Sequence, residues 1–240
     1  MNIGVIFAGG MGTRMHTKDK PKQFLEVYGR PVIIHTLLHF EECQDIDAVV
    51  IACIDEWIPY MRDLVFDFRI KKVRKIVAGG KTGQMSIYNA LVAAEEVAEG
   101  EKSIVLIHDG VRPLISADLL TQNIECVKKY GSCITTGVVK ETIVVTDGED
   151  RITNIPRRID CRVAKAPESF WLDEILSVQR KAISEGVTGA YDSCCLMNDY
   201  GYKLHMLDGP TENIKVTTPD DIYTMRAVLE KKENQQLYGF

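Results

Sequence analysis

The sequence predicts an α/β fold built on a Rossmann-like, mostly parallel sheet, with a β-arm that projects from it. Short apolar runs of strand length alternate with longer segments whose apolar residues recur at helical spacing. The short runs are continuously hydrophobic, as strands buried on both faces must be. From residue 133 to residue 165 the helical segments are missing, and several β-rich pieces follow one another.

Four apolar runs rich in Val and Ile are the expected strands of the first half of the chain. They cover residues 3–8, 47–53, 73–78 and 103–108. Runs of this length and composition, bounded by turn residues, are typical of buried strands. When such strands alternate with helices, they form parallel βαβ units with right-handed crossovers.

Three helices are expected in the same part of the chain, over 31–42, 84–98 and 116–130. The first begins with Pro31, which is well tolerated in the first turn of a helix. The second carries its apolar residues on one face. Ser116 is suited to cap the third, because a serine oxygen can accept a hydrogen bond from a free N–H group of the first turn.

The segment after Gly131 breaks this alternation. Its β-rich pieces are joined by turn residues at Asp147-Gly148, so we expect a hairpin arm at about 139–165 that leaves the main sheet. A two-stranded arm is marginally stable in water unless it packs on a surface. A partner subunit is the economical candidate for that surface.

The α/β alternation resumes after the arm and continues to the end of the chain. The expected elements are helices near 171–186 and 191–200, strands around 203–207 and 213–216, and a last helix from about residue 219. With 240 residues and 27.0 kDa, the whole chain, 1–240, fits one domain that carries the arm.

Composition excludes several classes of protein. The net charge is −5 and no long basic run occurs, which argues against non-specific binding to nucleic acid. No stretch approaches the roughly 18 apolar residues of a membrane helix. The first apolar run, 3–8, lacks a positive flank and is too short for a signal peptide. We therefore expect neither a nucleic-acid partner nor a membrane.

The seven cysteines indicate a reducing compartment. Their number is odd, no CxxC spacing occurs, and Cys194 and Cys195 are adjacent. This is neither the framework of a disulfide-rich secreted protein nor the spacing of a zinc site. Free thiols persist in reducing compartments, so we expect a cytoplasmic protein.

The connection after the first strand is rich in glycine and is followed by cations. It reads AGGMGTRM over 8–15, with PKQF at 21–24. Glycines let the backbone approach a ligand and offer N–H groups to phosphate oxygens, and Arg14 and Lys22 add the charge that a triphosphate needs. There is no GxxxxGK[ST], and Met15 stands where a dinucleotide fingerprint needs its third glycine. The alternative is a glycine-rich surface turn.

Four motifs, in order along the chain, resemble a known family. AGGMGTRM followed by PKQF resembles the opening signature of the sugar-nucleotide and polyol-phosphate nucleotidyltransferases. Three further stretches narrow the resemblance to the cytidylyltransferases that act on methylerythritol phosphate and ribitol phosphate. These are Gly79-Gly80 with Ser86, HDGVRP at 108–113, and NIKVT at 213–217. The resemblance covers about residues 3–230.

The resemblance implies an enzyme that transfers CMP from CTP to a polyol phosphate and releases pyrophosphate. Catalysis of such an in-line displacement is mainly positioning and neutralisation of charge. The resemblance places Arg14 and Lys22 on the triphosphate, and Lys215 on the attacked phosphate and its nucleophile. The alternatives of a different class are a catalytically inactive nucleotide-binding homologue and an oxidoreductase on a doubly wound sheet.

The resemblance also implies where the nucleotide binds. Backbone groups of the matching positions can read the edge of cytosine, while a purine would be too wide. One departure from the family pattern is Gly83, which stands where the family has an arginine. The expected nucleotide-binding residues are Ala8, Gly9, Gly10, Gly12, Gly79, Gly80, Lys81 and Ser86.

The acceptor is expected to contact Asp109 and Arg112, because a carboxylate accepts hydroxyl protons and a guanidinium grips phosphate with two donors. Thr142 and Arg158, on the arm, match positions that in the family reach the substrate of the partner subunit, and Arg157 is a competing candidate. The implied assembly is a homodimer that exchanges arms. The implied cofactor is Mg²⁺, held mostly by the CTP phosphates and weakly by Asp109.

The identity of the acceptor is indicated by smaller features. Trp57 and the Ile-Pro-x-Arg segment at 155–158 resemble ribitol-phosphate enzymes, so D-ribitol 5-phosphate or a close alditol phosphate is the expected acceptor. The alternative is 2-C-methyl-D-erythritol 4-phosphate. Two stretches, expected at the rim of the site, depart from both patterns: 166–168 reads APE in place of TPQ, and 191–193 reads YDS in place of TDA. They leave another alditol or glycerol phosphate open.

Overall fold

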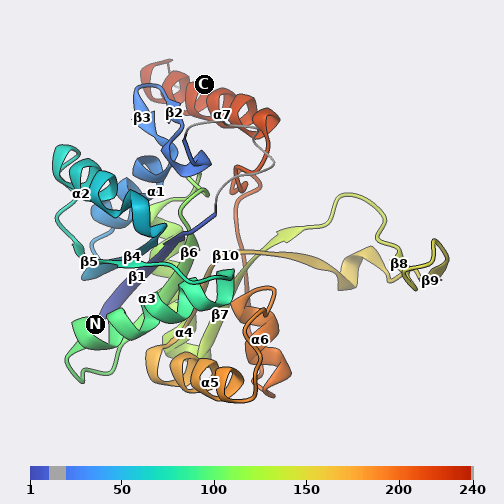
Figure 1. Cartoon of the computed structure of the whole chain (residues 1–240). Helices are drawn as coiled ribbons and strands as arrows, with labels where there is room; N and C mark the ends of the chain where they lie inside the picture. The colour runs from blue at the N-terminus through green and yellow to red at the C-terminus, as the bar shows by residue number, and fades with distance from the viewer. Residues whose placement is uncertain (11–19, 239–240) are drawn as a thin grey trace.

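A seven-stranded sheet forms the centre of the computed structural model, which describes residues 1–10 and 20–238 (Figure 1). Its strands lie in the order β11-β7-β10-β6-β1-β4-β5. Strand β10 runs antiparallel to both of its neighbours, and the other neighbouring pairs are parallel. The expected α/β class with a mostly parallel sheet is confirmed.

The four strands expected in the first half are β1 (Asn2–Ala8), β4 (Ala48–Cys53), β5 (Val73–Ala78) and β6 (Ile104–Asp109). Strand β1 lies between β4 and β6, and every residue of those two strands is buried. This explains their continuous hydrophobicity. Because the four strands are parallel, their carboxyl ends meet at one edge of the sheet.

The other half of the sheet contains β7 (Ser132–Val138), β10 (Arg162–Trp171) and β11 (Met206–Asp208). The strand expected at 203–207 is β11, shifted toward the C-terminus. The strand expected at 213–216 is wrong. That segment is held by single contacts, such as the N–H of Val216 donating to the carbonyl of Val111 at 2.8 Å, and it joins no ladder.

Helices cover both faces of the sheet (Figure 1). One face packs against α1 (Val32–Glu42), α2 (Ile58–Asp67) and α4 (Ala117–Tyr130). The other packs against α3 (Gly83–Ala98), α5 (Leu172–Ser184) and α6 (Ser193–Asp199). The last helix, α7 (Pro219–Tyr238), packs through Met225 onto a small separate core. As expected, Ser116 caps α4 by accepting the N–H of Leu119 at 3.2 Å.

Several short elements have no counterpart in the expectations from sequence. They are α2, the hairpin of β2 (Glu26–Val27) and β3 (Arg30–Pro31), and the 3-10 turns η2 (Lys22–Phe24), η3 (Asp55–Trp57) and η4 (Arg158–Asp160). Helix α2 buries only Met61 and Leu64. So narrow an apolar stripe gives little periodic signal.

The arm is present and extends away from the body of the molecule (Figure 1). It carries a small ladder of β8 (Val145–Thr146) and β9 (Ile152–Asn154) near its tip. Gly148 has φ +84° in the turn, where Asp147 Oδ1 accepts the N–H of Glu149 at 2.8 Å. Residues 162–165 belong to β10, so the arm spans 139–161 and not 139–165.

Two further findings concern the cysteines and the search for a membrane-spanning helix. All seven cysteines are free thiols. Over residues 1–10 and 20–238, no helix has both the length and the apolar content to cross a bilayer.

Candidate active site

The carboxyl edge of the sheet borders a cavity of about 420 Å³. Its walls come from the start of α3, the ends of β6 and β10, the start of α6 and the segment before α7. The cavity contains Asp109, Arg112 and Lys215, three of the side chains that the sequence singles out. Ligands of open α/β sheets bind at this edge, so the geometry agrees with the expected location.

Two glycine-rich connections meet beside this cavity. A methyl group added at Gly9, after β1, would lie 3.1 Å from Ser86 Oγ, and one added at Gly79, after β5, would lie 3.0 Å from the same atom. At Gly80 the added carbon would lie 2.3 Å from Met85 Cβ. At Gly80 a side chain cannot fit without movement of the turn, and at Gly9 and Gly79 it would be tight, so the structure brings these expected nucleotide-binding residues together around Ser86.

We call Gly9, Gly79, Gly80 and Ser86 the glycine wall. Ser86 links this wall to α3 through hydrogen bonds. Its Oγ atom accepts the N–H of Gly80 at 3.0 Å and donates to the carbonyl of Thr82 at 3.0 Å. Thr82 in turn caps α3, with Oγ1 accepting the N–H of Met85 at 3.2 Å. The turn after β5 is therefore fixed by side chains of the helix that follows it.

Lys22 is held against the first glycine connection. It lies in η2, where it is buried, and a methyl group added at Gly10 would lie 4.0 Å from its Cε. The next residue, Gln23, donates from Nε2 to the carbonyl of Ala8 at 2.8 Å. Phe24 stacks on Trp57 with the ring centroids 5.0 Å apart, which anchors η2 to the turn after β4.

Two of the expected site residues, Gly12 and Arg14, lie outside the described residues. Lys81, at the turn before α3, is exposed and follows Gly80 directly. Its place beside the glycine wall agrees with a role for its backbone, which stays a prediction.

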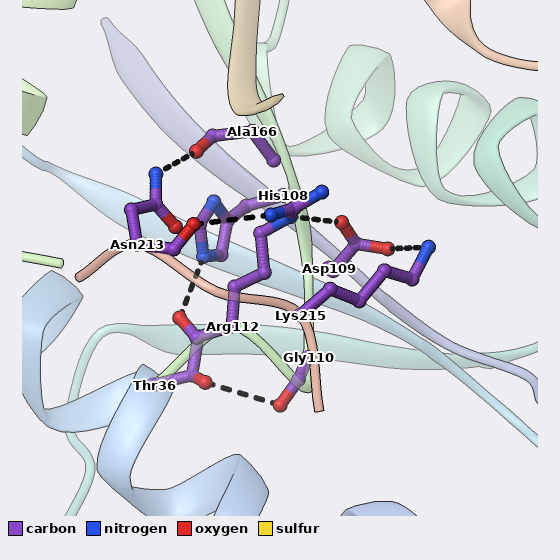
Figure 2. Close-up of polar contacts among 8 residues, drawn as sticks. All are labelled: Thr36, His108, Asp109, Gly110, Arg112, Ala166, Asn213 and Lys215. Carbon is purple, nitrogen blue, oxygen red and sulfur yellow. Dashed lines mark hydrogen bonds and ion pairs between the residues drawn. The ribbon is translucent and has the colours of Figure 1, made fainter. Parts of the chain in front are cut away.

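The charged centre of the site is Asp109, at the end of β6 (Figure 2). Lys215 Nζ lies 2.6 Å from its Oδ1 atom, and Arg112 Nε lies 2.7 Å from its Oδ2 atom. Burial opposes ionisation of Asp109, but the two cations outweigh it and hold the pKa of the carboxyl below its ordinary value. The carboxylate therefore keeps Lys215 and Arg112 in fixed positions at one wall of the cavity.

A second layer of hydrogen bonds orients this centre (Figure 2). Arg112 also donates to the carbonyl of Asn213 at 3.3 Å, and the side-chain amide of Asn213 donates to the carbonyl of Ala166 at 2.7 Å. His108 Nε2 lies 3.1 Å from the carbonyl oxygen of Arg112. Burial lowers the pKa of His108 to about 4, so it is neutral, which agrees with a packing role.

Asp109 is poorly suited to hold a metal ion directly in this arrangement. Both of its oxygens face cations, and a divalent ion would have to displace one of them. A second group of potential ligands is Asp192 with Cys194 and Cys195, whose ligand atoms lie within 4.8 Å of one another. However, Asp192 caps α6 by accepting the N–H of Cys195 at 2.8 Å. Hydrogen bonding to Asp192 and burial also raise the pKa of the Cys195 thiol to about 11, which disfavours a thiolate ligand.

The comparisons with known proteins agree with this geometry. A family model described as 2-C-methyl-D-erythritol 4-phosphate cytidylyltransferase matches residues 3–231. The chain belongs to this cytidylyltransferase family. The family is named for transfer of a cytidylyl group. Asp109, Arg112 and Lys215, from two of the motifs that resemble this family, line one cavity.

Relatives within the family differ in the acceptor for which they are named. The chain is 52% identical to the ribitol-5-phosphate cytidylyltransferase of Streptococcus agalactiae serotype V, over 100% of this chain and 99% of that protein. It is 33% identical to the 2-C-methyl-D-erythritol 4-phosphate cytidylyltransferase of Clostridium acetobutylicum, over 98% of this chain and 100% of that protein.

A solved structure of similar fold is the 4-diphosphocytidyl-2C-methyl-D-erythritol synthase of Anaerococcus prevotii. It has a TM-score of 0.82 and 25% identity, over 95% of this chain and 96% of that one. The cytidylyltransferase fold expected from the motifs is thereby confirmed.

The departure from the family pattern at Gly83 opens space in this cytidylyltransferase. Gly83 is the first residue of α3 and lines the cavity, and a methyl group added there would meet nothing within 4 Å. Lys81, two residues earlier, is the nearest cation along the chain.

The arm residues lie apart from the cavity of their own chain. Thr142 and Arg158 are exposed and are not among the residues that line it. Arg158 donates to the carbonyl of Lys140 at 3.1 Å, while Arg157 forms two hydrogen bonds to Asp160 at 2.8 and 3.0 Å. Both arginines are thus on the exposed arm, and which of them serves a partner stays open.

Among the polar residues of the cavity wall that sequence reasoning did not assign to the site are Gln84, Glu168 and Ser193. Gln84 is buried and accepts the N–H of Ala190 at 2.8 Å. Ser193 and Glu168 are also buried, whereas the departures around them were expected at the rim. Only Tyr191, which is 96% exposed, stands at the rim. The signal that could have found Glu168 was its place as the one charged residue of the stretch 166–171, APESFW.

Proposed function

We propose that the protein transfers CMP from CTP to D-ribitol 5-phosphate, forming CDP-ribitol and releasing pyrophosphate. The observation that carries the proposal is the 52% identity, over the full chain, to a relative named for this activity. The ion network of Asp109, Arg112 and Lys215 in a cavity next to the glycine wall supplies a site of suitable chemistry.

The reaction is an in-line displacement at the α-phosphorus of CTP. A phosphate oxygen of the acceptor attacks the α-phosphorus of CTP, a new P–O bond forms, and the bond between the α- and β-phosphates breaks. Negative charge moves onto the pyrophosphate that leaves. No covalent intermediate with the protein is needed, so the task of the site is to orient two anions and to neutralise their charge.

Lys215 is the cation best placed for the attacked phosphate. Its side chain is 39% exposed and lines the cavity. The side chain of Asp109, which is 7% exposed, forms an ion pair with it. The ion pair with the buried carboxylate of Asp109 restricts the rotamers of Lys215. A preorganised cation of this kind stabilises charge that develops in the transition state without reorganisation.

The triphosphate is the proposed ligand of Lys22 and Arg14. Lys22 lies against Gly10, at the connection whose backbone N–H groups suit phosphate oxygens. We propose that Mg²⁺ enters with CTP and is held mainly by its phosphates, since both oxygens of Asp109 are already paired with cations. The metal would supply further neutralisation of phosphate charge.

We also propose a homodimer in which each arm reaches the site of the other subunit. The arm exposes apolar side chains that a monomer leaves in water: Val144, Val145, Ile152, Ile155 and Ile159. Burial of such side chains on a partner would stabilise the arm. Thr142 and Arg158 would then contact the acceptor in the partner's cavity.

Dilution tests this assembly. Sedimentation velocity should show the dimer dissociating on dilution, and the activity of the same samples should fall with the fraction of dimer. A fully active monomer at nanomolar concentration would contradict arm exchange.

The cytoplasm is the proposed location. All seven thiols are free, and free thiols persist where the environment is reducing.

A pyrophosphate-release assay with CTP and Mg²⁺ tests the proposed function. Ribitol 5-phosphate should give the highest kcat/KM in a panel with glycerol 3-phosphate and 2-C-methyl-D-erythritol 4-phosphate. Preference for the methylerythritol compound would favour the activity named in the family description. Release with none of the three would indicate an inactive nucleotide-binding homologue.

A further inference from the structure

The cavity proposed for the acceptor has a second polar wall, which carries no positive charge and so differs from the centre around Asp109. Besides Asp109, Arg112 and Lys215, the cavity is lined by Glu168 of β10 and by Ser193 at the start of α6. Neither of these two side chains carries a positive charge, so neither can neutralise phosphate. Their chemistry points to a different part of the ligand.

Ser193 belongs to the lining of the cavity, and its hydroxyl is buried. The residue is 2% exposed, and within residues 1–10 and 20–238 its Oγ atom has no hydrogen-bond partner. Buried hydroxyl groups in folded proteins are nearly always bonded, because an unpaired one loses its hydration without compensation. An unpaired hydroxyl on a cavity wall therefore indicates a partner that the ligand supplies.

Glu168 belongs to the same part of the wall. It is 7% exposed, and its Oε2 atom accepts the N–H of Cys194, the residue next to Ser193, at 3.0 Å. Burial, assisted by the charge of Asp192, raises the pKa of Glu168 to about 8. At neutral pH the carboxyl is therefore mostly protonated, so it can both donate and accept hydrogen bonds.

We propose that Glu168 and Ser193 together bind one hydroxyl of the polyol chain and so select acceptors that carry a hydroxyl at that position, an inference that rests on the proposed transfer to a polyol phosphate. A substrate hydroxyl donates one hydrogen bond and accepts others, which matches a carboxylic acid beside a serine. A methyl branch in the same place leaves the Ser193 hydroxyl and the acid proton of Glu168 without a partner, while Glu168 keeps only its bond from the N–H of Cys194. Sites built around a hydroxyl reject analogues that lack it far more strongly than apolar pockets reject an extra group.

A purely structural role for Glu168 is the competing explanation. In that case Glu168 would only tie β10 to α6 through the N–H of Cys194. The charged and titratable groups that influence it are Asp109 on β6, and Asp192, Cys194 and Cys195 at the start of α6. The raised pKa of both thiols keeps them uncharged near neutral pH, and the lowered pKa of Asp109 keeps that carboxyl ionised there.

Steady-state kinetics on the full-length protein separate the two roles. Ser193→Ala and Glu168→Met should each raise KM for ribitol 5-phosphate by about tenfold or more, with KM for CTP within about twofold of the wild type. The preference for ribitol 5-phosphate over methylerythritol 4-phosphate should fall by a similar factor. Glu125→Gln, on the exposed face of α4, is the matched control and should leave both constants unchanged.

Glu168→Gln gives a second readout that a structural role would not produce. The amide keeps an acceptor for the N–H of Cys194 and mimics the protonated acid, so KM for ribitol 5-phosphate at pH 7 should rise less than in Glu168→Met. The wild type should lose kcat/KM for ribitol 5-phosphate as the pH rises through about 8, when Glu168 releases its proton. The glutamine variant should not show this loss.

Three outcomes would overturn the inference. Unchanged acceptor preference in Ser193→Ala and Glu168→Met would show that neither side chain selects the acceptor. A joint rise of both KM values with a lowered Tm would assign Glu168 to structure alone. A wild type that releases no pyrophosphate with any polyol phosphate would refute the proposed function, and this inference with it, whereas the first two outcomes leave that function intact.

Discussion

The site has two regions of different construction: a wall of glycines beside the cavity and a charged wall within it. The glycine wall of Gly9, Gly79, Gly80 and Ser86 is the proposed nucleotide wall, and it is made of closely packed backbone. The acceptor wall is made of side chains from segments far apart in the sequence, with Asp109 at the end of β6 as its centre. Close backbone packing suits a flat base, while fixed charges suit phosphate.

The comparison shows why the two walls tolerate change differently. On the nucleotide wall a single added methyl group collides with a neighbour, so the limit is steric. On the acceptor wall the limit is electrostatic, because each buried charge depends on a partner from another element. Substitutions should therefore affect KM for CTP on one side, and turnover or acceptor choice on the other.

The largest effect is expected from Lys215→Met on the acceptor wall. Loss of a preorganised cation should lower kcat/KM about 100- to 1,000-fold, or about 3–4 kcal/mol of transition-state stabilisation. Pyrophosphate release measures the effect, and Lys203→Met, at an exposed lysine, is the control that should change little. A loss below tenfold would mean that Lys215 does not meet the developing charge.

The next effect is expected on the nucleotide wall, from Gly80→Ala. The added methyl group would lie 2.3 Å from Met85 Cβ, so the turn must move away from α3. KM for CTP should rise about tenfold or more, while KM for the acceptor changes little. Gly189→Ala is the control, because a methyl group there meets nothing within 4 Å. Equal effects of the two substitutions would refute the steric explanation.

Ser86→Ala should have a smaller effect on the same wall. It removes the acceptor for the N–H of Gly80 and leaves that turn less restrained. We expect a loss of about 1–2 kcal/mol in CTP binding, measured by isothermal titration calorimetry. Ser184→Ala, at an exposed serine outside the cavity, serves as the control. Unchanged CTP affinity would show that the turn is rigid without Ser86.

The smallest effect concerns the pH dependence of stability. The pKa of Glu168 is raised from 4.5 to about 8 in the folded protein, so between these values the folded state holds a proton that the unfolded state has released. The free energy of unfolding should therefore fall as the pH rises from about 4.5 to about 8. Glu168→Gln should remove this part of the slope, at least about 1 kcal/mol across the window, in urea unfolding followed by circular dichroism. Identical slopes would mean that Glu168 is ionised in the folded state.

The two walls also differ in how far the sequence predicts them. The nucleotide wall follows from local motifs, since AGG at 8–10 and GG at 79–80 each follow a continuous apolar strand. Parallel strands bring such connections to one edge, so their meeting around Ser86 follows from the fold class. The strands and three helices of the first half are likewise local patterns, and they were predicted correctly.

The acceptor wall depends on contacts that no local pattern states. Asp109 and Lys215 are far apart in the sequence, and their proximity was expected only from the resemblance to a family. The stretch 166–168 was expected at the rim, but the antiparallel strand β10 places Glu168 inside. The segment 213–216, wrongly expected to be a strand, bonds through the N–H of Val216 to the carbonyl of Val111, which follows β6, and pairs with no strand.

The most direct test of the central claim is phosphorus NMR of the product. Incubation with CTP, Mg²⁺ and ribitol 5-phosphate should yield equal amounts of pyrophosphate and of a new diphosphate with two coupled resonances, and both should require the acceptor. Appearance of CDP with inorganic phosphate, or of products independent of the acceptor, would show that the site does not transfer CMP to a polyol phosphate.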